Sequence, residues 1–319
     1  MRVLACPASL KGVLGPVEAA AALAEGVRRV AGVAVEEVPV ADGGEGTAEV
    51  LFRALGGEWR TASVEGPLGR VVEARWLRLP DGRGVVEAAA AIGLTLVAPD
   101  AHDPLRASSR GLGQLVAAAV AAGTTQLLVC LGGVATVDGG AGMREVVTTL
   151  PVPVRVACDV RNPLLGPRGA ARVYGPQKGA EPAAAEELER RLAAMRELAP
   201  FVELPGAGAA GGLGAAFAAL GAELVSGAEL VLELVRFRDR VHDAALAVTG
   251  EGIVDATSVD GKAPGAVARA CAALRVRCVV FGGLVRAAVP GAEMQALSGD
   301  RALARDDLVA LGESLARAL

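Results

Sequence analysis

The chain has 319 residues, a net charge of -4 and 52% hydrophobic residues. This length suggests about two domains of roughly 150 residues each, and the hydrophobic fraction allows large cores without disulfides. The chain lacks a basic block and has only 3% aromatic residues, so its composition argues against a nucleic-acid partner. No apolar run reaches the ~20 residues that a membrane span requires.

The five cysteines indicate a reducing environment. They form no C-x-x-C pair, and four of them lie in or next to apolar, strand-like runs. Thiols of this kind are typical core residues of cytosolic proteins. We therefore expect a cytoplasmic protein, and the sequence leaves a monomer and a homodimer equally open.

The first sixty residues predict alternating strands and helices. Residues 3–6 form an apolar strand, and Gly15-Pro16 opens a helix, because proline suits the first helical turn. Residues 33–40 form the next strand, which ends in the loop Asp42-Gly43-Gly44-Glu45-Gly46, and a helix follows over 47–55. Loops at the carboxyl ends of strands are where open α/β sheets bind ligands.

The middle of the chain has a different character. Residues 58–88 alternate polar and apolar side chains between Gly-Pro and Asp-Gly turns, which is typical of hairpins. A helix over 111–122 and a buried strand over 126–131 follow, and the strand leads to a second glycine loop, Asp138-Gly139-Gly140-Ala141-Gly142. Further on we expect a strand over 152–158 and an amphipathic helix over 181–198.

The last third returns to the alternating pattern. It predicts strands over 246–249 and 278–281, a helix over 266–274 and a closing helix over 302–318. The fold class is therefore α/β with two domains. Residues 1–60 and 242–319 would form a Rossmann- or flavodoxin-like domain with a parallel sheet, and residues 61–241 an inserted mixed α/β domain.

Carboxylates recur in glycine-rich loops that follow apolar strands. They are Asp42, Glu45, Asp138, Asp159, Glu251 and Asp255. Any one of them could simply satisfy the backbone of its own turn. Together they suit Mg²⁺-nucleotide chemistry, because Mg²⁺ is usually held by one or two carboxylates and phosphate oxygens. Phosphoryl transfer also needs cationic groups and a base for the acceptor hydroxyl.

Lysine is rare in this chain and has a common context. Only Lys11, Lys178 and Lys262 occur among 32 basic residues, and each adjoins a glycine in the sequence. A compact ammonium differs from arginine most where it must meet a phosphate or a carboxylate. We therefore interpret the three lysines as candidate site residues.

A third glycine cluster, residues 206–211, matches the dinucleotide pattern G-x-G-x-x-G through Gly208 and Gly211. The match is weak, because the pattern requires a preceding strand, and Pro205 interrupts the short run "FVEL". A dinucleotide-dependent oxidoreductase is therefore a minor alternative. A glycine-rich turn at a helix start can still bind a phosphate through its free N–H groups.

Six stretches carry a resemblance to a known family: "CPASLKGVLGPVEAAAALAEGVRR", "PVADGGEGT", "GGVATVDGGAGM", "ACDVRNPLLGPRGAARVYGPQKGA", "PGAGAAGGLGAA" and "TGEGIVDATSVDGKAPGAVA". They resemble, in the same order, the motifs of the bacterial type I glycerate kinases. The resemblance implies two α/β domains with the active site in the cleft between them. It also implies transfer of the γ-phosphoryl group of ATP to D-glycerate, with Mg²⁺ and in many members at the 2-hydroxyl to give 2-phosphoglycerate.

The resemblance also implies roles for residues that match the family motifs. The expected catalytic residues are Lys11, Asp42, Asp138, Asp159, Lys178 and Lys262. Expected to bind substrate or nucleotide are Ser9, Gly43, Gly44, Glu45, Gly139, Gly140, Asn162, Gly208, Gly211 and Glu251. Asp255 and Glu251 are the expected metal ligands.

The chain departs from the family pattern at several polar positions. Ala8 and Val13 stand where aspartate and serine are usual, Val134 and Val137 where serine and asparagine are usual, and Ile253 and Thr257 where arginine and glutamine are usual. A related small hydroxy acid is therefore an alternative substrate. A non-catalytic relative that binds a small acid is the main alternative function.

Overall fold

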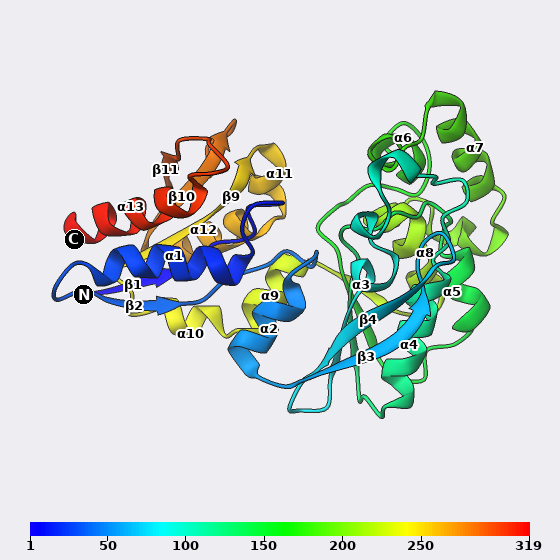
Figure 1. Ribbon diagram of the computed structural model, residues 1–319, viewed down its shortest axis with the longest axis horizontal. Coiled ribbons are helices and arrows are strands. Elements are labelled where there is room, and N and C mark those ends of the chain that lie inside the picture. The colour runs from blue at the N-terminus through cyan, green and yellow to red at the C-terminus, as the bar shows by residue number, and fades with distance from the viewer. The chain divides into compact units, whose positions relative to one another are not determined.

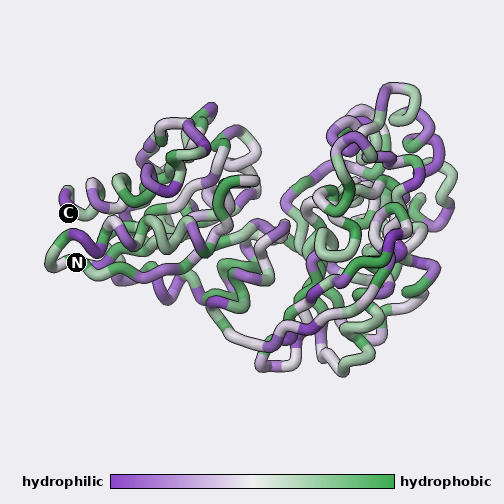
Figure 2. Tube along the Cα trace, in the orientation of Figure 1, coloured by the Kyte–Doolittle hydropathy of each residue, from purple (hydrophilic) through white to green (hydrophobic). Residues whose placement is uncertain are grey.

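The computed structural model describes residues 1–319 apart from the side chain of Asp260, and the chain forms two compact units. The first unit contains residues 1–42, 49–54 and 227–319, and the second contains residues 43–48 and 55–226. Each unit has its own sheet and its own hydrophobic core (Figure 1). Hydrophobic segments of the trace accordingly occur in both units (Figure 2).

The sheet of the first unit is parallel, with the strand order β11-β10-β9-β1-β2. Its strands are β1 (Arg2–Ala5), β2 (Ala34–Glu37), β9 (Leu246–Val254), β10 (Arg277–Val285) and β11 (Glu293–Ala296). Numbered within this sheet alone, the order is the 2-1-3-4-5 of flavodoxin-like folds. The structure therefore confirms the predicted parallel sheet, which joins the two ends of the chain.

Helices α1 (Pro16–Arg28) and α12 (Ala263–Leu274) pack against this sheet. The other α-helices of the first unit, wholly or in part, are α2 (Thr47–Leu55), α9 (Gly227–Leu234), α10 (Phe237–Val241), α11 (Ala256–Asp260) and α13 (Ala304–Arg317). Leu23 of α1 and Leu308 of α13 belong to one core with Val3 and Phe281 of the sheet, and α12 packs against β9 and β10 (Figure 1).

Two strands of the first unit are longer than the sequence predicts. The apolar runs end at Thr249 and Phe281, whereas β9 continues to Val254 and β10 to Val285. The extensions contain glycines, and glycine has a low intrinsic preference for β-strands. Here the parallel pairing of the two strands continues through Leu284 and Ile253, so tertiary hydrogen bonding overrides that preference.

The second unit has a six-stranded mixed sheet with the order β3-β4-β5-β6-β7-β8. Its strands are β3 (Glu58–Glu65), β4 (Val71–Arg78), β5 (Gly84–Glu87), β6 (Leu127–Cys130), β7 (Val154–Ala157) and β8 (Glu223–Val225). The first three strands pair antiparallel, as predicted from the hairpin pattern, and β5 to β8 pair parallel.

The α-helices of the second unit are α3 (Ala88–Ile92), α4 (Arg110–Ala121), α5 (Ala141–Val146), α6 (Ala170–Tyr174), α7 (Pro182–Ala193) and α8 (Leu213–Ala219). The prediction of one helix over 181–198 was wrong at its end: α7 stops at Ala193, and a 3-10 helix follows over Arg196–Phe201. Pro200 lies in this second segment, and a proline cannot donate an α-helical hydrogen bond and clashes with the carbonyl four residues earlier.

The units differ from the sequence-based division at residues 60 and 242 in three stretches, and one of them, residues 55–60, groups with the second unit as the start of its continuous segment 55–226. Residues 43–48 group with the second unit, where the backbone N–H of Ala48 donates to Glu87 Oε1 at 2.7 Å. Residues 227–241 group with the first unit, where Arg240 Nη1 donates to Glu36 Oε1 at 2.8 Å. Of the helices described, none combines the length and the apolar character needed to cross a membrane.

Candidate active site

A cavity of about 390 Å³ lies at the carboxyl ends of strands in the first unit. Its walls come from the loop after β1, the ends of β9 and β10, the start of α12 and the segment between β11 and α13. β1 has β2 on one side and β9 on the other, so the direction of strand addition reverses between β1 and β9. Open α/β sheets bind ligands at such a switch point. Five predicted site residues line this cavity: Ser9, Lys11, Glu251, Asp255 and Lys262.

Two lysines and a buried glutamate are among the charged side chains that line the cavity. Lys262 Nζ lies 3.6 Å from Glu251 Oε2. Glu251 is 6% exposed, and its Oε1 is buried without a hydrogen-bond partner. Burial raises the pKa of Glu251 above its ordinary value, and the nearby charge of Asp42 adds to this effect, while Ser258, Lys262 and Lys11 oppose it. The carboxylate of Glu251 therefore has an oxygen, Oε1, that is free to bind a ligand or a cation.

The first glycine loop is divided between the units. Asp42 belongs to the first unit and is close enough to Glu251 to affect its pKa, whereas Gly43, Gly44 and Glu45 belong to the second unit. The structure thus brings Asp42 to the charged group of the cavity, as a half-buried carboxylate.

Asp255 has a structural role at the start of α11. It is the N-cap residue, and its Oδ1 accepts hydrogen bonds from Thr257 N at 2.9 Å and Thr257 Oγ1 at 2.6 Å. These bonds lower the pKa of Asp255 below its ordinary value. Asp255 lines the cavity with one carboxylate oxygen already engaged, so its assignment as a metal ligand stays a prediction.

In the second unit, Asp138 is the centre of the second glycine loop. Its Oδ2 accepts from Ser109 N at 2.8 Å, from Ser109 Oγ at 2.7 Å and from Gly142 N at 3.2 Å, and its Oδ1 accepts from Gly140 N at 3.1 Å. Gly140, with φ +72, precedes α5. A carboxylate is favourable at this helix start because unpaired N–H groups face it. Asp138 therefore holds the loop against the start of α4.

Lys178 lies beneath the same loop. It is 3% exposed, and its Nζ donates to the carbonyl oxygen of Thr136 at 2.7 Å. Burial lowers the pKa of Lys178 to about 7, and the charge of Asp138 partly opposes this shift. A Cβ on Gly211 would lie 2.1 Å from the same Thr136 oxygen, and Gly139 N donates to Gly211 O at 3.0 Å. The structure therefore brings Asp138, Gly139, Lys178 and Gly211 together.

Asn162 and Gly208 meet in a second loop cluster of this unit. Asn162 Nδ2 donates to Arg168 O at 2.7 Å, Asn162 Oδ1 accepts from Tyr174 Oη at 2.7 Å, and Gly208 N donates to Asn162 O at 3.0 Å. Asp159 Oδ1 accepts from Ser226 Oγ at 3.3 Å. The segment before Gly208 is the 3-10 helix Arg196–Phe201 and turns, so the strand that a dinucleotide fingerprint requires does not precede it.

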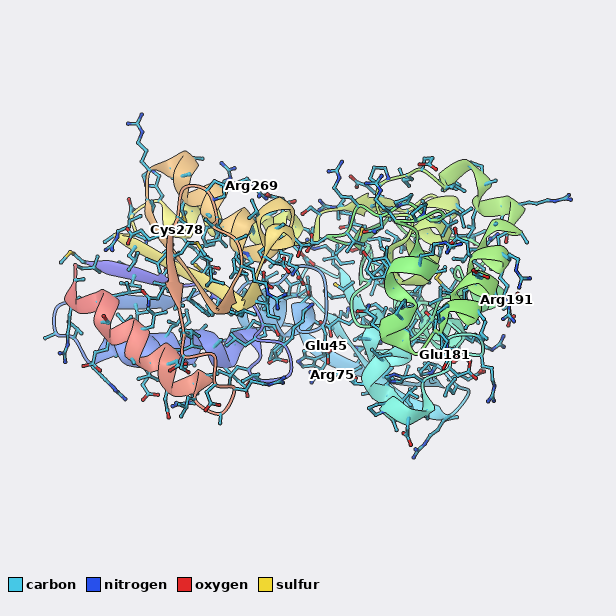
Figure 3. The ribbon with its side chains drawn as sticks, turned by 90° about the horizontal axis from the view of Figure 1, so that it is seen from above. Glu45, Arg75, Glu181, Arg191, Arg269 and Cys278 are labelled. Atoms are coloured by element: carbon cyan, nitrogen blue, oxygen red, sulfur yellow. The ribbon has the colours of Figure 1, made fainter. Side chains whose placement is uncertain are left out.

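Glu45 lies near Glu87, a residue that the sequence did not single out. Glu87 ends β5 and accepts the N–H of Ala48, and burial raises its pKa, with Glu45 adding to the shift and Arg75 opposing it. Figure 3 labels Glu45 and Arg75, both of which act on the pKa of Glu87. A Cβ on Gly132 would come 2.6 Å from Gly44 Cα. The bare backbone of the two glycines thus allows the first loop to approach the end of β6.

Comparisons with known proteins identify relatives of this chain. The glycerate kinase family profile matches residues 3–151 and 147–306. The chain is 41% identical over 309 residues to the glycerate 2-kinase of Escherichia coli (strain K12), a match that covers 84% of this chain and 81% of the relative. The chain belongs to the glycerate kinase family. The chain is also 39% identical over 326 residues to the glycerate kinase of Bacillus subtilis (strain 168), and this match covers 89% of this chain and 85% of the relative.

A solved structure supports the same membership of the glycerate kinase family. It comes from Salmonella typhimurium LT2 and is provisionally assigned as glycerate kinase 2. The TM-score is 0.84 at 31% sequence identity, and the match covers 100% of this chain and 98% of the other. The order of strands and helices described above is therefore that of a glycerate kinase fold.

The departures from the glycerate kinase pattern lie in two kinds of place. Ala8, Val134 and Val137 are buried, with exposed fractions of 8%, 4% and 1%, and the two valines belong to the core of the second unit. Apolar side chains are favourable there because unpaired buried polar groups are costly. Ile253 lies in the cavity at 45% exposure, and Thr257 hydrogen-bonds to Asp255. Ile253 and Val13, which stands where the family usually has serine, are thus the departures that line the cavity.

The sequence missed Glu87, Ser109 and the segment after β11 that lines the cavity. Glu87 lies within a stretch interpreted only as hairpin, although it directly follows the apolar "GVV" at a strand end. Ser109 directly precedes α4, where serine is a common cap. Leu297 and Arg301 belong to no recognisable sequence motif. Their place in the cavity that Lys11 also lines therefore follows only from the fold.

Proposed function

We propose that the protein transfers the γ-phosphoryl group of Mg²⁺-bound ATP to D-glycerate, giving 2-phosphoglycerate and ADP. The observation that carries the proposal is the group of Lys11, Lys262 and the buried Glu251 in a cavity at the switch point of the parallel sheet. Family membership supports glycerate phosphorylation, and the name of the Escherichia coli relative supports the 2-hydroxyl as the acceptor.

The residues of the cavity fit a metal that arrives with the nucleotide. Among the described side chains, no group of three or more His, Cys, Asp and Glu residues is arranged to hold a metal. Mg²⁺ in nucleotide sites typically takes one or two carboxylates and completes its shell with phosphate oxygens and water. Glu251 Oε1, buried without a partner, is the fitting protein ligand, and Asp255 is the second candidate. When bound, Mg²⁺ would neutralise negative charge on the phosphate oxygens.

The chain supplies the remaining groups for the transfer. In the reaction, the 2-hydroxyl oxygen of glycerate bonds to the γ-phosphorus, the bond from that phosphorus to the bridging oxygen breaks, and ADP leaves with the bridging oxygen. We assign Asp42, the remaining carboxylate near Glu251, to accept the hydroxyl proton. Lys11 and Lys262 stabilise the charge of the phosphate oxygens as compact cations.

In the second unit, the proposed roles are those of positioning. Asp138 and Lys178 hold the loop over residues 136–142 through hydrogen bonds to Ser109 and to the carbonyl of Thr136. Phosphoryl transfer depends mainly on positioning and charge. Loss of either side chain would therefore lower turnover by displacing this loop, with Gly139 and Gly140 in it.

An ADP-release assay over a panel of small hydroxy acids tests the proposal. Purified protein is assayed with and without Mg²⁺ on D-glycerate, L-glycerate, lactate and tartrate, and the product is identified by ³¹P NMR. We expect Mg²⁺-dependent ADP release that is fastest with D-glycerate, and a resonance of 2-phosphoglycerate. Folded protein without ADP release on any acid would favour the non-catalytic, acid-binding alternative. A thermal shift with NADH but not with ATP would favour an oxidoreductase.

A further inference from the structure

The cavity of the first unit has an apolar wall in addition to its charged group. The wall consists of Val13, Ile253, Leu284 and Leu297. Ile253 and Leu284 are register partners on the parallel strands β9 and β10, so they lie side by side. Both are large apolar side chains with high exposure, 45% and 44%. A pair of neighbouring exposed apolar side chains in a cavity indicates a binding surface.

Bare backbone lies beside this wall. Gly252 and Gly283 also line the cavity, and they fall between the paired residues on either side of them, Glu251 with Gly282 and Ile253 with Leu284. The two glycines are therefore neighbours on adjacent strands. Glycine within a strand often marks a place where a ligand approaches the backbone closely. A flat group can thus contact the strand backbone next to the wall.

Glycerate cannot use the apolar wall. Each of its carbons bears an oxygen, so contact with aliphatic side chains would strip water from hydroxyl or carboxylate groups without replacing their hydrogen bonds. A nucleotide combines an anionic phosphate chain with a flat base that has apolar faces. The cavity combines the cations Lys11 and Lys262 with the wall in about 390 Å³, within the range of roughly 300–1,000 Å³ typical of ligand pockets.

We infer that the wall of Val13, Ile253, Leu284 and Leu297 binds the nucleobase of the phosphoryl donor, with the phosphates directed to Lys11 and Lys262. The inference rests on the proposed kinase function and adds the location of the donor base within the first unit. It makes Ile253 and Leu284 determinants of nucleotide affinity, with no role for either in binding the acid.

The test separates the base from the phosphates. Dissociation constants are measured by calorimetry for Mg²⁺-ATP and for inorganic tripolyphosphate with Mg²⁺, using the parent protein, Ile253→Asn and Leu284→Asn. We expect each variant to bind ATP at least about fivefold more weakly, because apolar contact area is lost. Binding of tripolyphosphate and the KM for glycerate should both stay within about twofold of the parent values, the limit of a near-neutral change.

Leu303→Asn provides the matched control. Leu303 belongs to the same unit and is 46% exposed, but it is not among the residues that line the cavity. This variant should bind ATP like the parent, and circular dichroism should show all three variants folded. Equal weakening of ATP and tripolyphosphate would overturn the inference, as would a raised KM for glycerate with unchanged ATP binding. If the parent protein binds no ATP at all, the proposed function itself fails.

Discussion

Lys178 is the residue whose burial has the clearest energetic consequence. Its pKa falls from an ordinary 10.5 to about 7 in the folded protein. Between these two pH values the unfolded chain holds a proton on Lys178 that the folded protein has released, so stability rises with pH across this window. Below about pH 7 both states are protonated, and the full cost of burying the ammonium is present.

We predict that Lys178→Met stabilises the protein at pH 6 by about 2–4 kcal/mol, because one pKa unit corresponds to about 1.4 kcal/mol and the lost hydrogen bond to Thr136 opposes the gain. The gain should shrink as pH rises from 7 towards 10. Urea unfolding at pH 6, 7.5 and 9 measures it, with Lys11→Met as the control at an exposed lysine. A gain that does not change with pH would contradict the assigned ionisation.

For the two lysines of the cavity, Lys11 and Lys262, we expect an effect on activity, whereas the effect at Lys178 is on stability. Lys262 Nζ lies 3.6 Å from Glu251, and Lys11 lines the same cavity. Arginine keeps the charge, but its larger planar group needs another geometry. Lys262→Arg and Lys11→Arg should lower kcat/KM by at least ~10-fold with little change in melting temperature. Arg83→Lys, at a turn where Arg83 pairs with Asp81, should have parental activity. Parental activity in both lysine variants would remove them from the site.

At the scale of elements, α1 and α13 pack with unusually close backbones. A Cβ on Gly26 of α1 would lie 1.9 Å from the carbonyl oxygen of Val309, and one on Gly312 of α13 would lie 2.2 Å from that of Leu23. Alanine is intrinsically better than glycine in a helix by about 1 kcal/mol. Propensity alone would therefore favour alanine at Gly26, whereas the packing opposes it.

We predict that Gly26→Ala destabilises the protein by about 1–3 kcal/mol, the usual cost of overpacking a core contact. Ala21→Gly calibrates helix propensity at an exposed position of the same helix. It should cost about 1 kcal/mol. Thermal and urea unfolding of both variants measure the two effects. Stabilisation by Gly26→Ala would show that the helices separate easily at this contact.

The sequence predicts the elements whose stability is local. Pro16 and an apolar stripe mark α1, and Thr47–Leu55 carries α2 with the predicted bounds. Elements that depend on distant partners escape such patterns. β9 and β10 run through Gly252 and Gly283 because each strand pairs with the other, and periodicity in one segment contains no information about its partner.

The same limit applies to the site. Carboxylates and lysines in glycine loops identify Glu251, Lys262 and Asp138 as candidates, but they do not show that Asp138 accepts four hydrogen bonds from its own unit. They also do not show that Lys178 is buried. Burial and hydrogen-bond partners follow from segments far apart in sequence, such as Ser109 and Asp138.

At the scale of the molecule, each unit has its own core, so each should fold largely by itself. The second unit consists of residues 43–48 and 55–226, and its core includes Trp76, Leu115, Met143 and Phe217. Residues 43–48 contact the rest of this unit at a strand end, where Gly44 lies against Gly132, and Ala48 N donates a hydrogen bond to Glu87. Residues 43–48 should therefore add to the stability of a unit whose other residues, 55–226, form one continuous segment.

We predict that a fragment of residues 43–226 unfolds cooperatively, and that a fragment of residues 55–226 is less stable by about 1–3 kcal/mol. The reason is that the half-buried carboxylate of Glu87 loses the N–H of Ala48, and leaving a largely desolvated acceptor unpaired costs that much. Circular dichroism followed by urea unfolding of both fragments measures the difference. In the shorter fragment, Glu87→Leu should recover part of the loss, since the unpaired carboxylate is then absent. A longer fragment without a cooperative transition would show that the second unit depends on the first for its fold, and equal stability of the two fragments would show that residues 43–48 contribute nothing to it.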